Sequence, residues 1–530
     1  MFLHRFIISI NAYLPPTNHW STLVATIPVA FATGTLFVYS AFSTQLAEKC
    51  GLDVSQTGNL NISATLGSAL GGILSGIVTD MYGSQLPILF SCIMLSLGYF
   101  WLYCSYLQGF NATSVQLLAA MFFVGLGSVS GYFSSLKAVV VNFPDNKGAA
   151  QSVTIASFAI SSLIYSWVST KVLNGDTEKF LLILSISCGI LTLFGFIFIR
   201  LDGHIDNVDQ EEESFLADMR HEIEYLENID TSTSESTSLM DGSTSDILAN
   251  SSNNTSRSNI SEEYRKANTL TPQVIQTTVR NRQDLKHKSL KDSLLHPIFW
   301  FHYFIFSITQ GFGQMYIYSV GFILKAEHYY YTHEKYLDPS VAPNTPTLHY
   351  LQALHVSIIA LSSFGGRLAS GPVSDIFVKK FQLQRHWGLI FGTIIMFIGH
   401  VLLMFCFPSR FQYLYQGNII LMVISCLIGF AYGFTFTCYP VIVSDIFSLQ
   451  NYSFIWGCLY TSTTFGLTFM SKLFGMIYDM NSDYWDDKSK SYVCNRGSWC
   501  YQLTFEITSL LCIFVISVVL IFIYIRHRYR

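Results

Sequence analysis

A positive charge within an apolar stretch is the feature of this sequence best suited to chemistry. Arg367 lies deep in the stretch 349–376, in the run Phe364-Gly-Gly-Arg367-Leu-Ala-Ser-Gly371. A charge at the centre of a bilayer costs about 3 kcal/mol or more, so such a residue is a functional candidate by default. We therefore predict a functional role for Arg367, either as a substrate contact or as a structural or gating charge.

Other polar side chains in apolar stretches are weaker candidates. Tyr39, Gln314, Tyr318 and His355 could line a cavity with Arg367, although residues of these types are more often satisfied core residues. Lys137 and Lys472 lie near the ends of their stretches, and we expect both to reach the membrane interface. Groups that could carry a coupling proton are sparse: His302, His355, His400 and Glu506.

The composition indicates the kind of element that must position these residues. The chain has 530 residues, of which 51% are apolar and only 12% are charged. Soluble domains carry about 25% charged residues. The net charge of −4 provides no basic field for nucleic acid. These values exclude a soluble multidomain enzyme and a nucleic-acid-binding protein, and they indicate an all-α polytopic membrane protein.

The apolar stretches are long enough to cross a bilayer, which takes roughly 20 helical residues. Twelve such stretches can be delimited, six before a polar break and six after it: 20–43, 57–79, 86–106, 115–141, 149–172, 179–200, 297–324, 349–376, 387–407, 417–443, 452–478 and 501–525. The predicted domains are an N-terminal segment 1–19, a six-helix bundle 20–200, a linker 201–294, a second six-helix bundle 295–525 and a tail 526–530.

An even number of spans places both termini on one side. Counting Lys and Arg in the short loops and before the seventh span gives fourteen against nine in favour of cytosolic termini. The linker 201–294 is acidic, then rich in Ser, Thr and Asn, then basic, a composition that favours disorder. It is either a solvated connection between the bundles or a segment controlled by phosphorylation. The vacuolar and the plasma membrane are both compatible with these features.

Cysteine usage points to one disulfide and to no metal site. Cys494 and Cys500 lie six residues apart in a polar loop predicted to face outward, where a disulfide between them is plausible. The other cysteines are scattered in apolar stretches. We find no His/Cys spacing typical of a metal site, no phosphate-binding loop and no catalytic constellation. The sequence therefore predicts no cofactor and no enzyme activity.

The two halves repeat each other in register. The second stretch ends with Gly76 and Asp80, and the eighth ends with Gly371 and Asp375, each Gly four residues before its Asp. Such glycines allow close helix approach. Each Asp could accept hydrogen bonds from a neighbouring helix N-terminus or pair with a cation. We predict that Gly76, Asp80, Gly83, Gly371 and Asp375 form gates, with plain packing glycines and solvated carboxylates as the alternative.

The sequence around these residues resembles the motifs of a known family. The run Gly76-Ile-Val-Thr-Asp80-Met-Tyr-Gly83 resembles the loop motif Gly-x-x-x-Asp-Arg-x-Gly-Arg of the major facilitator superfamily, with Met81 at the usual Arg position. Asn142-Phe-Pro-Asp-Asn-Lys-Gly148 and Ile442-Val-Ser-Asp-Ile-Phe447 are similar to segments of its nodulin-like branch and fungal relatives. This branch lies near the oxalate/formate antiporters and monocarboxylate porters. The resemblance implies twelve transmembrane helices in two pseudo-symmetric six-helix bundles.

The same resemblance bears on Arg367. Its surroundings are similar to the Gly-Arg-x-x-x-Gly of oxalate/formate-type porters, where this arginine meets the substrate carboxylate. Those antiporters have a second cation, a lysine, where this chain has Leu459. The resemblance therefore implies an anchor for a single carboxylate.

The expected function is transport of a small organic solute by alternating access, active or facilitated, most simply of a carboxylate-type anion. The alternative is a non-transporting nutrient sensor of the same fold that signals through the middle loop. Expected partners are the solute, a coupling proton in the active case and the lipid bilayer; nucleic acid is not among them. The protein is expected to be a monomer.

Overall fold

Helices form nearly all of the described chain, and each long helix coincides with a predicted apolar stretch. The computed structural model describes residues 15, 17–52, 54–174, 176–200, 290–330, 348–405, 414–482, 484–486, 491–494 and 496–528. Residues 1–14 and most of the predicted linker, residues 201–289, lie outside the described residues. The last residues of the predicted linker belong to α12 (Leu290–Leu295).

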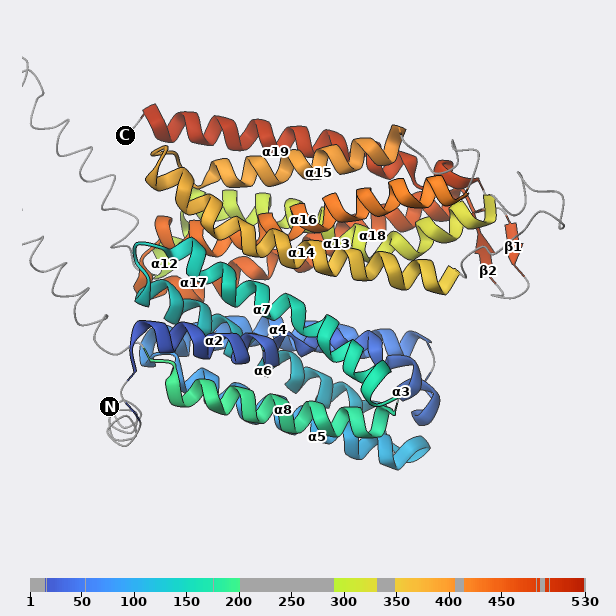
Figure 1. Cartoon of the computed structure of the whole chain (residues 1–530), viewed down its shortest axis with the longest axis horizontal. Coiled ribbons are helices and arrows are strands. Elements are labelled where there is room, and N and C mark those ends of the chain that lie inside the picture. Colours follow the sequence, from blue (N-terminus) through green and yellow to red (C-terminus); the bar gives the residue numbers. More distant parts are fainter. Residues whose placement is uncertain are drawn as a thin grey trace, which may run out of the picture. The chain divides into compact units, whose positions relative to one another are not determined.

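The N-terminal bundle contains six long helical segments (Figure 1). They are α2 (His19–Thr33), which continues as the 3₁₀-helix η1 (Gly34–Ala41), α4 (Val54–Tyr82), α5 (Gln85–Gln108), α6 (Ser114–Asn142), α7 (Lys147–Trp167), which continues as the π-helix η3 (Val168–Val172), and α8 (Thr177–Phe198). The short α3 (Ser43–Cys50) and η2 (Gly109–Asn111) lie in connections. α6 packs against α2, α4 and α5, which places it in the interior of this bundle.

The C-terminal bundle repeats this arrangement (Figure 1). Its spans are α13 (Pro297–Tyr330), α14 (Leu348–Lys379), α15 (His386–Phe405), α16 (Leu414–Ile446), the pair α17 (Tyr452–Tyr460) and α18 (Ser462–Met480), and α19 (Gln502–Arg528). The eleventh span was predicted as one helix, but it is divided at Thr461. A single 3₁₀ turn, η7 (Leu449–Asn451), precedes α17. α16 packs against α13, α14 and α15, as its counterpart α6 does in the first bundle.

Local signals in the sequence set several helix starts. Asn18 and Ser21 form a capping box at the start of α2, and Thr113 and Gln116 form another at the start of α6. Gly83 ends α4 with a φ of 87°, a left-handed conformation that suits glycine. Each start or end lies within a few residues of a predicted boundary.

Among the described residues, nine helices are long and apolar enough to cross a membrane. The predicted seventh, eighth and eleventh spans, α13, α14 and α17–α18, are not among the nine. α13 carries Gln310 and Gln314, α14 carries Arg367, and the eleventh span is divided. Polar residues in these three spans lower their hydropathy, as expected of helices that face the protein interior rather than lipid.

The start of α2 and the end of α19 lie at the same end of the helical bundles (Figure 1). We call this the inner end, because the Lys and Arg count predicts that it faces the cytosol, and the opposite end the outer end. Contacts between the two bundles run mainly from α4 to α17 and from α7 to α14. Each pair contains one helix that ends and one helix that begins at the inner end.

The outer loop between α18 and α19 holds the non-helical structure. Strand β1 (Tyr484–Asp486) pairs antiparallel with β2 (Ser491–Val493), with Tyr484 opposite Val493. A disulfide joins Cys494 to Cys500, at the end of the 3₁₀-helix η8 (Gly497–Cys500), which packs against α13. The Tyr501 hydroxyl donates to Glu327 Oε1 on α13 at 2.6 Å. The disulfide thus closes a loop that is anchored on α13.

Removing this disulfide should have a measurable effect on stability. A cross-link that closes so short a loop stabilises by about 2 kcal/mol through the unfolded chain. We expect Cys494→Ser/Cys500→Ser to lower the thermal unfolding temperature. A membrane-impermeant maleimide added from the outside should label these thiols in the wild type only after reduction. Labelling that does not increase on reduction would contradict the assignment.

Candidate functional site

Two aspartates connect the bundles at the inner end. Asp80, near the end of α4, accepts hydrogen bonds from the backbone N–H groups of Ser453 (3.1 Å) and Phe454 (2.9 Å) at the start of α17. Asp375, near the end of α14, accepts from Gly148 (3.2 Å) and Ala149 (2.8 Å) at the start of α7. Each carboxylate therefore caps a helix of the opposite bundle, where the positive end of the helix dipole favours a negative charge.

Glycines allow the helices to approach closely enough for these contacts. A Cβ added at Gly76 would lie 2.7 Å from the Ser453 carbonyl oxygen, and one at Gly371 would overlap the Gly148 carbonyl oxygen. Neither position could accept the methyl group of an alanine without a backbone shift. Gly76 and Gly371 lie one turn before Asp80 and Asp375, so the close contact and the helix cap form at the same level.

The sequence predicted a different position for the residue that pairs with Asp80. Lys137 of α6 donates to Asp80 Oδ1 at 2.6 Å, and the two side chains are only 3% and 8% exposed. The prediction that Lys137 reaches the membrane interface is therefore wrong. It occupies the interior of the N-terminal bundle and supplies the cation that Met81 cannot. The exposed Lys472 on α18 remains compatible with an interfacial position.

The corresponding partner of Asp375 is Arg385, which the sequence analysis did not single out. Arg385 Nη1 donates to Asp375 Oδ1 at 2.7 Å, and its Nε donates to Asp445 at the end of α16. Burial lowers the pKa of Arg385, but Asp445 and Asp375 raise it by more, so the net shift is upward and the group stays charged. Lys147 of the N-terminal bundle lies 3.5 Å from Asp445, which links this network to the opposite bundle.

Substituting Gly371 tests the close contact at the inner end. Gly371→Ala places a methyl group against the Gly148 backbone and should destabilise the protein by about 1–3 kcal/mol, as overpacking does. Gly365→Ala on the same helix is the matched control, because a Cβ there meets nothing within 4 Å. The control should be neutral or slightly stabilising. Equal unfolding temperatures for both variants would contradict the proposed close packing.

Arg367 lies in a second cluster, on the face of α14 toward the opposite bundle. It is 6% exposed, and its Nε and Nη1 atoms are buried without a hydrogen-bond partner among the described residues. Its guanidinium carbon lies 4.5 Å from the ring centroid of Phe436 and 5.6 Å from that of Tyr432. Cation–π contact offsets part of the burial cost, but neither ring neutralises the charge.

Aromatic side chains of both bundles extend from the rings that contact this guanidinium: Phe436 meets Trp456 and Tyr460, and both of these meet Phe133 of α6. We call Arg367, Tyr132, Tyr432, Phe436, Trp456 and Tyr460 the central cluster. Tyr132 of α6 lies next to Phe133, with ring centroids 5.8 Å apart, and Tyr460 lies at the break in the eleventh span. Tyr132 stacks on Phe158 of α7 at 4.2 Å, which fixes its ring. The Tyr132 hydroxyl and Trp456 Nε1 are buried without a hydrogen-bond partner in the described chain.

The structure brings one of the four predicted cavity residues, Gln314, next to a ring that contacts Arg367. Gln314 Nε2 donates to the Tyr432 hydroxyl at 3.4 Å, and the Gln314 Oε1 atom is buried without a partner among the described residues. Tyr318, one turn further along α13, is 54% exposed. Gln314 therefore borders the central cluster through Tyr432.

Tyr39 and His355 instead contact residues of their own bundles. The Tyr39 hydroxyl donates to the Thr57 carbonyl oxygen at 2.9 Å. His355 is fully buried, with Nδ1 2.8 Å from the Ser425 hydroxyl, which also bonds Tyr316. His355 lies twelve positions before Arg367, about 18 Å along the helix. The described contacts do not bring either residue to the guanidinium.

Two similar bundles of long apolar helices define a polytopic membrane protein. The chain belongs to the Major Facilitator Superfamily, whose sequence profile matches residues 22–384 and 341–530.

Individual relatives agree with the family. The chain is 28% identical to an uncharacterized membrane protein of Saccharomyces cerevisiae, over 94% of each chain. It is 24% identical to the probable transporter MCH1 of Wickerhamomyces anomalus, over 84% of this chain and 77% of that one. It is 22% identical to the uncharacterized MFS-type transporter YhjX of Escherichia coli, over 84% and 86%.

Solved structures agree on the fold. The proton:xylose symporter XylE, bound to 6-bromo-6-deoxy-D-glucose, superposes with a TM-score of 0.55 over 93% of this chain and 94% of that chain. At 13% sequence identity this likeness concerns the fold alone.

Proposed function

We propose that this transporter carries a small monoanionic carboxylate by alternating access, with Arg367 as the anchor for the carboxylate. The observation that carries the proposal is the pair of free donors, Nε and Nη1, on a guanidinium that is 6% exposed. A buried unpaired charge is costly. A substrate carboxylate would satisfy both donors and neutralise the charge at once.

The number of cations in the central cluster favours a monoanion. Lys137 and Arg385 are committed to carboxylates at the inner end, and position 459 of α17 is a leucine. Among the described residues of the central cluster, Arg367 alone carries a positive charge. A dicarboxylate would bring a second negative charge among aromatic rings, where its desolvation is not compensated. The rings instead favour a flat or apolar substrate body.

The two aspartate caps support alternating access. We propose that Asp80 and Asp375 hold the inner end closed while the substrate enters from the outer end. Opening the inner end would break four backbone hydrogen bonds at the starts of α7 and α17. It would also separate the backbones at Gly76 and Gly371. A substrate that binds residues of both bundles can compensate this loss when it closes the opposite end.

Uptake into proteoliposomes tests the substrate class. The panel should include short and aromatic monocarboxylates, dicarboxylates of matched length, neutral amides of the same acids, and sugars. We expect uptake of monocarboxylates and at least a tenfold preference over dicarboxylates and amides, since charge-assisted hydrogen bonds contribute about 1.5–3 kcal/mol. Preferential uptake of a sugar or of a neutral amide would refute the proposal.

A further inference from the structure

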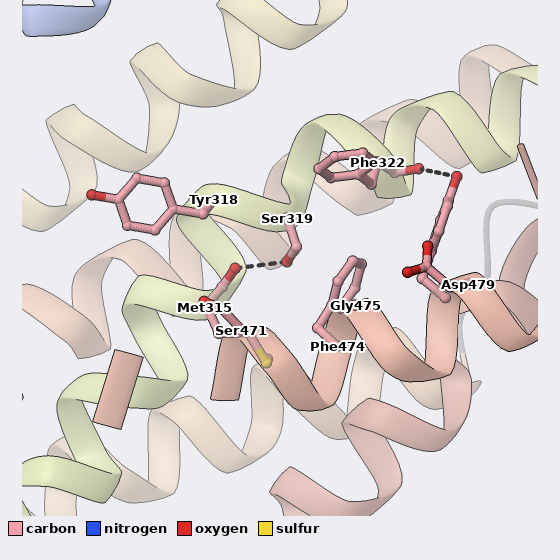
Figure 2. A pocket seen from close by; sticks show the side chains of 9 residues that line it. Met315, Tyr318, Ser319, Phe322, Ser471, Phe474, Gly475 and Asp479 are labelled. Atoms are coloured by element: carbon pink, nitrogen blue, oxygen red, sulfur yellow. Dashed lines mark hydrogen bonds between the residues drawn. The ribbon is translucent and has the colours of Figure 1, made fainter. Parts of the chain in front are cut away.

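A cavity of 280 Å³ separates the outer ends of α13 and α18 (Figure 2). It lies within the C-terminal bundle and shares only Tyr318 with the residues considered above. Its walls are mainly aromatic and apolar, with one carboxylate: Met315, Tyr318, Phe322, Phe474, Tyr478 and Asp479. Asp479 is exposed and Phe322 is 54% exposed, so a ligand can reach the cavity from the surface.

The paths of the two helices explain the cavity. Near the middle of the span, α13 and α18 are in backbone contact, since a Cβ added at Gly311 would lie 2.8 Å from the Gly466 carbonyl oxygen. Towards the outer end they diverge, and a Cβ added at Gly475 would meet nothing within 4 Å. The space is therefore a wedge between two helices that touch at its base.

The walls of the cavity offer aromatic rings and one carboxylate. The Phe474 and Tyr478 rings stack at 5.8 Å, and the Phe322 and Tyr478 rings meet edge to face at 5.6 Å. The Ser319 hydroxyl donates to the Met315 carbonyl oxygen at 2.7 Å, so it does not offer its proton to a ligand. The Asp479 carboxylate has no hydrogen-bond or ion-pair partner among the described residues. Figure 2 shows Asp479 and the two Phe rings around the same space.

We propose that this cavity binds an organic cation made of one aromatic ring and a short alkylammonium chain. The ring would lie against Phe322, Phe474 and Tyr478, and the ammonium group would pair with Asp479. The volume is near the lower limit of small-molecule sites, roughly 300 Å³, which admits one ring rather than a fused system. The preference for positive charge is opposite to that at Arg367, so the site is distinct from the proposed substrate site.

Equilibrium binding to the full-length protein in nanodiscs tests this inference. The probes are 2-phenylethylammonium, the neutral 2-phenylethanol and the anion 3-phenylpropionate, which are similar in size but differ in charge. We expect the ammonium probe to bind about tenfold more tightly than the alcohol, from an ion pair and a cation–π contact together. Asp479→Asn should remove this preference, whereas Glu48→Gln, which changes an exposed carboxylate on α3, should not.

A second variant locates the probe. Gly475→Leu places a side chain in the empty space and should abolish ammonium binding, while the Asp479→Asn result stands even if this variant folds poorly. The phenylpropionate probe is also a monocarboxylate, so its binding is compared in an Arg367→Gln background, where the proposed substrate site is removed. Equal binding of all three probes, no binding of the ammonium probe, or a preference unchanged in Asp479→Asn would overturn the inference.

Discussion

Arg367→Gln is expected to abolish carboxylate uptake while leaving the protein folded. The glutamine side chain cannot supply a charge, and it offers one donor group in place of the guanidinium fork. Losing two charge-assisted hydrogen bonds, each about 1.5–3 kcal/mol, should lower kcat/KM by about 100-fold or more. The free energy of unfolding should instead rise, because the substitution removes a buried cation that has no carboxylate partner in the described chain.

Two controls separate the anchor from a structural role. Arg367→Lys keeps the charge without the fork and should retain partial uptake. Lys472→Gln removes an exposed cation from α18 and should leave uptake unchanged. If Arg367→Gln transported carboxylates at the wild-type rate, Arg367 would not be the anchor. If its unfolding temperature fell sharply, the charge would have a structural partner.

Asp80→Ala is expected to have the largest effect on stability. It leaves Lys137 buried without a counter-ion, and breaking such a pair typically costs about 3–5 kcal/mol. It also removes the acceptor for two N–H groups at the start of α17. The thermal unfolding temperature should therefore fall, and the inner end should open. Labelling of a cysteine at the buried position 151, where Gln151 bonds Tyr452 of the opposite bundle, should increase from the inner side.

The double variant Asp80→Ala/Lys137→Met separates these two effects. Replacing the buried lysine by an apolar side chain of similar length removes the uncompensated charge, so much of the lost stability should return. The missing helix cap is not restored, so residue 151 should stay accessible. An Asp80→Ala protein with wild-type stability, or a double variant with a closed inner end, would contradict the role assigned to this pair.

The repeat in the sequence predicted the aspartates but not their partners. Gly76, Asp80, Gly371 and Asp375 stand out because the same spacing occurs at the ends of two corresponding spans. Lys137 lies 57 residues from Asp80 and on another helix, and hydropathy alone places a lysine near a helix end at the interface. Only the packing of α6 inside its bundle brings it to the carboxylate.

The central cluster was partly predictable for a similar reason. Arg367 is conspicuous, because a charge in an apolar helix has few explanations. Tyr132, Trp456 and Tyr460 are not, since aromatic residues make up 15% of the chain and occur on every face of its helices. Neither the hydropathy nor the spacing shows that the eleventh span is divided at Thr461, next to Tyr460. His355 illustrates the opposite error, because its polarity suggested a cavity with Arg367, but its Nδ1 lies 2.8 Å from the Ser425 hydroxyl inside its own bundle.

The most direct test of the account is whether Arg367 recognises the negative charge of its ligand. Binding of one monocarboxylate and of its neutral amide should be measured by calorimetry on the wild type and on Arg367→Gln, in nanodiscs at one ionic strength. We predict that the wild type binds the carboxylate at least tenfold more tightly than the amide, and that the variant binds both equally weakly. A variant that keeps the wild-type preference for the carboxylate would contradict it.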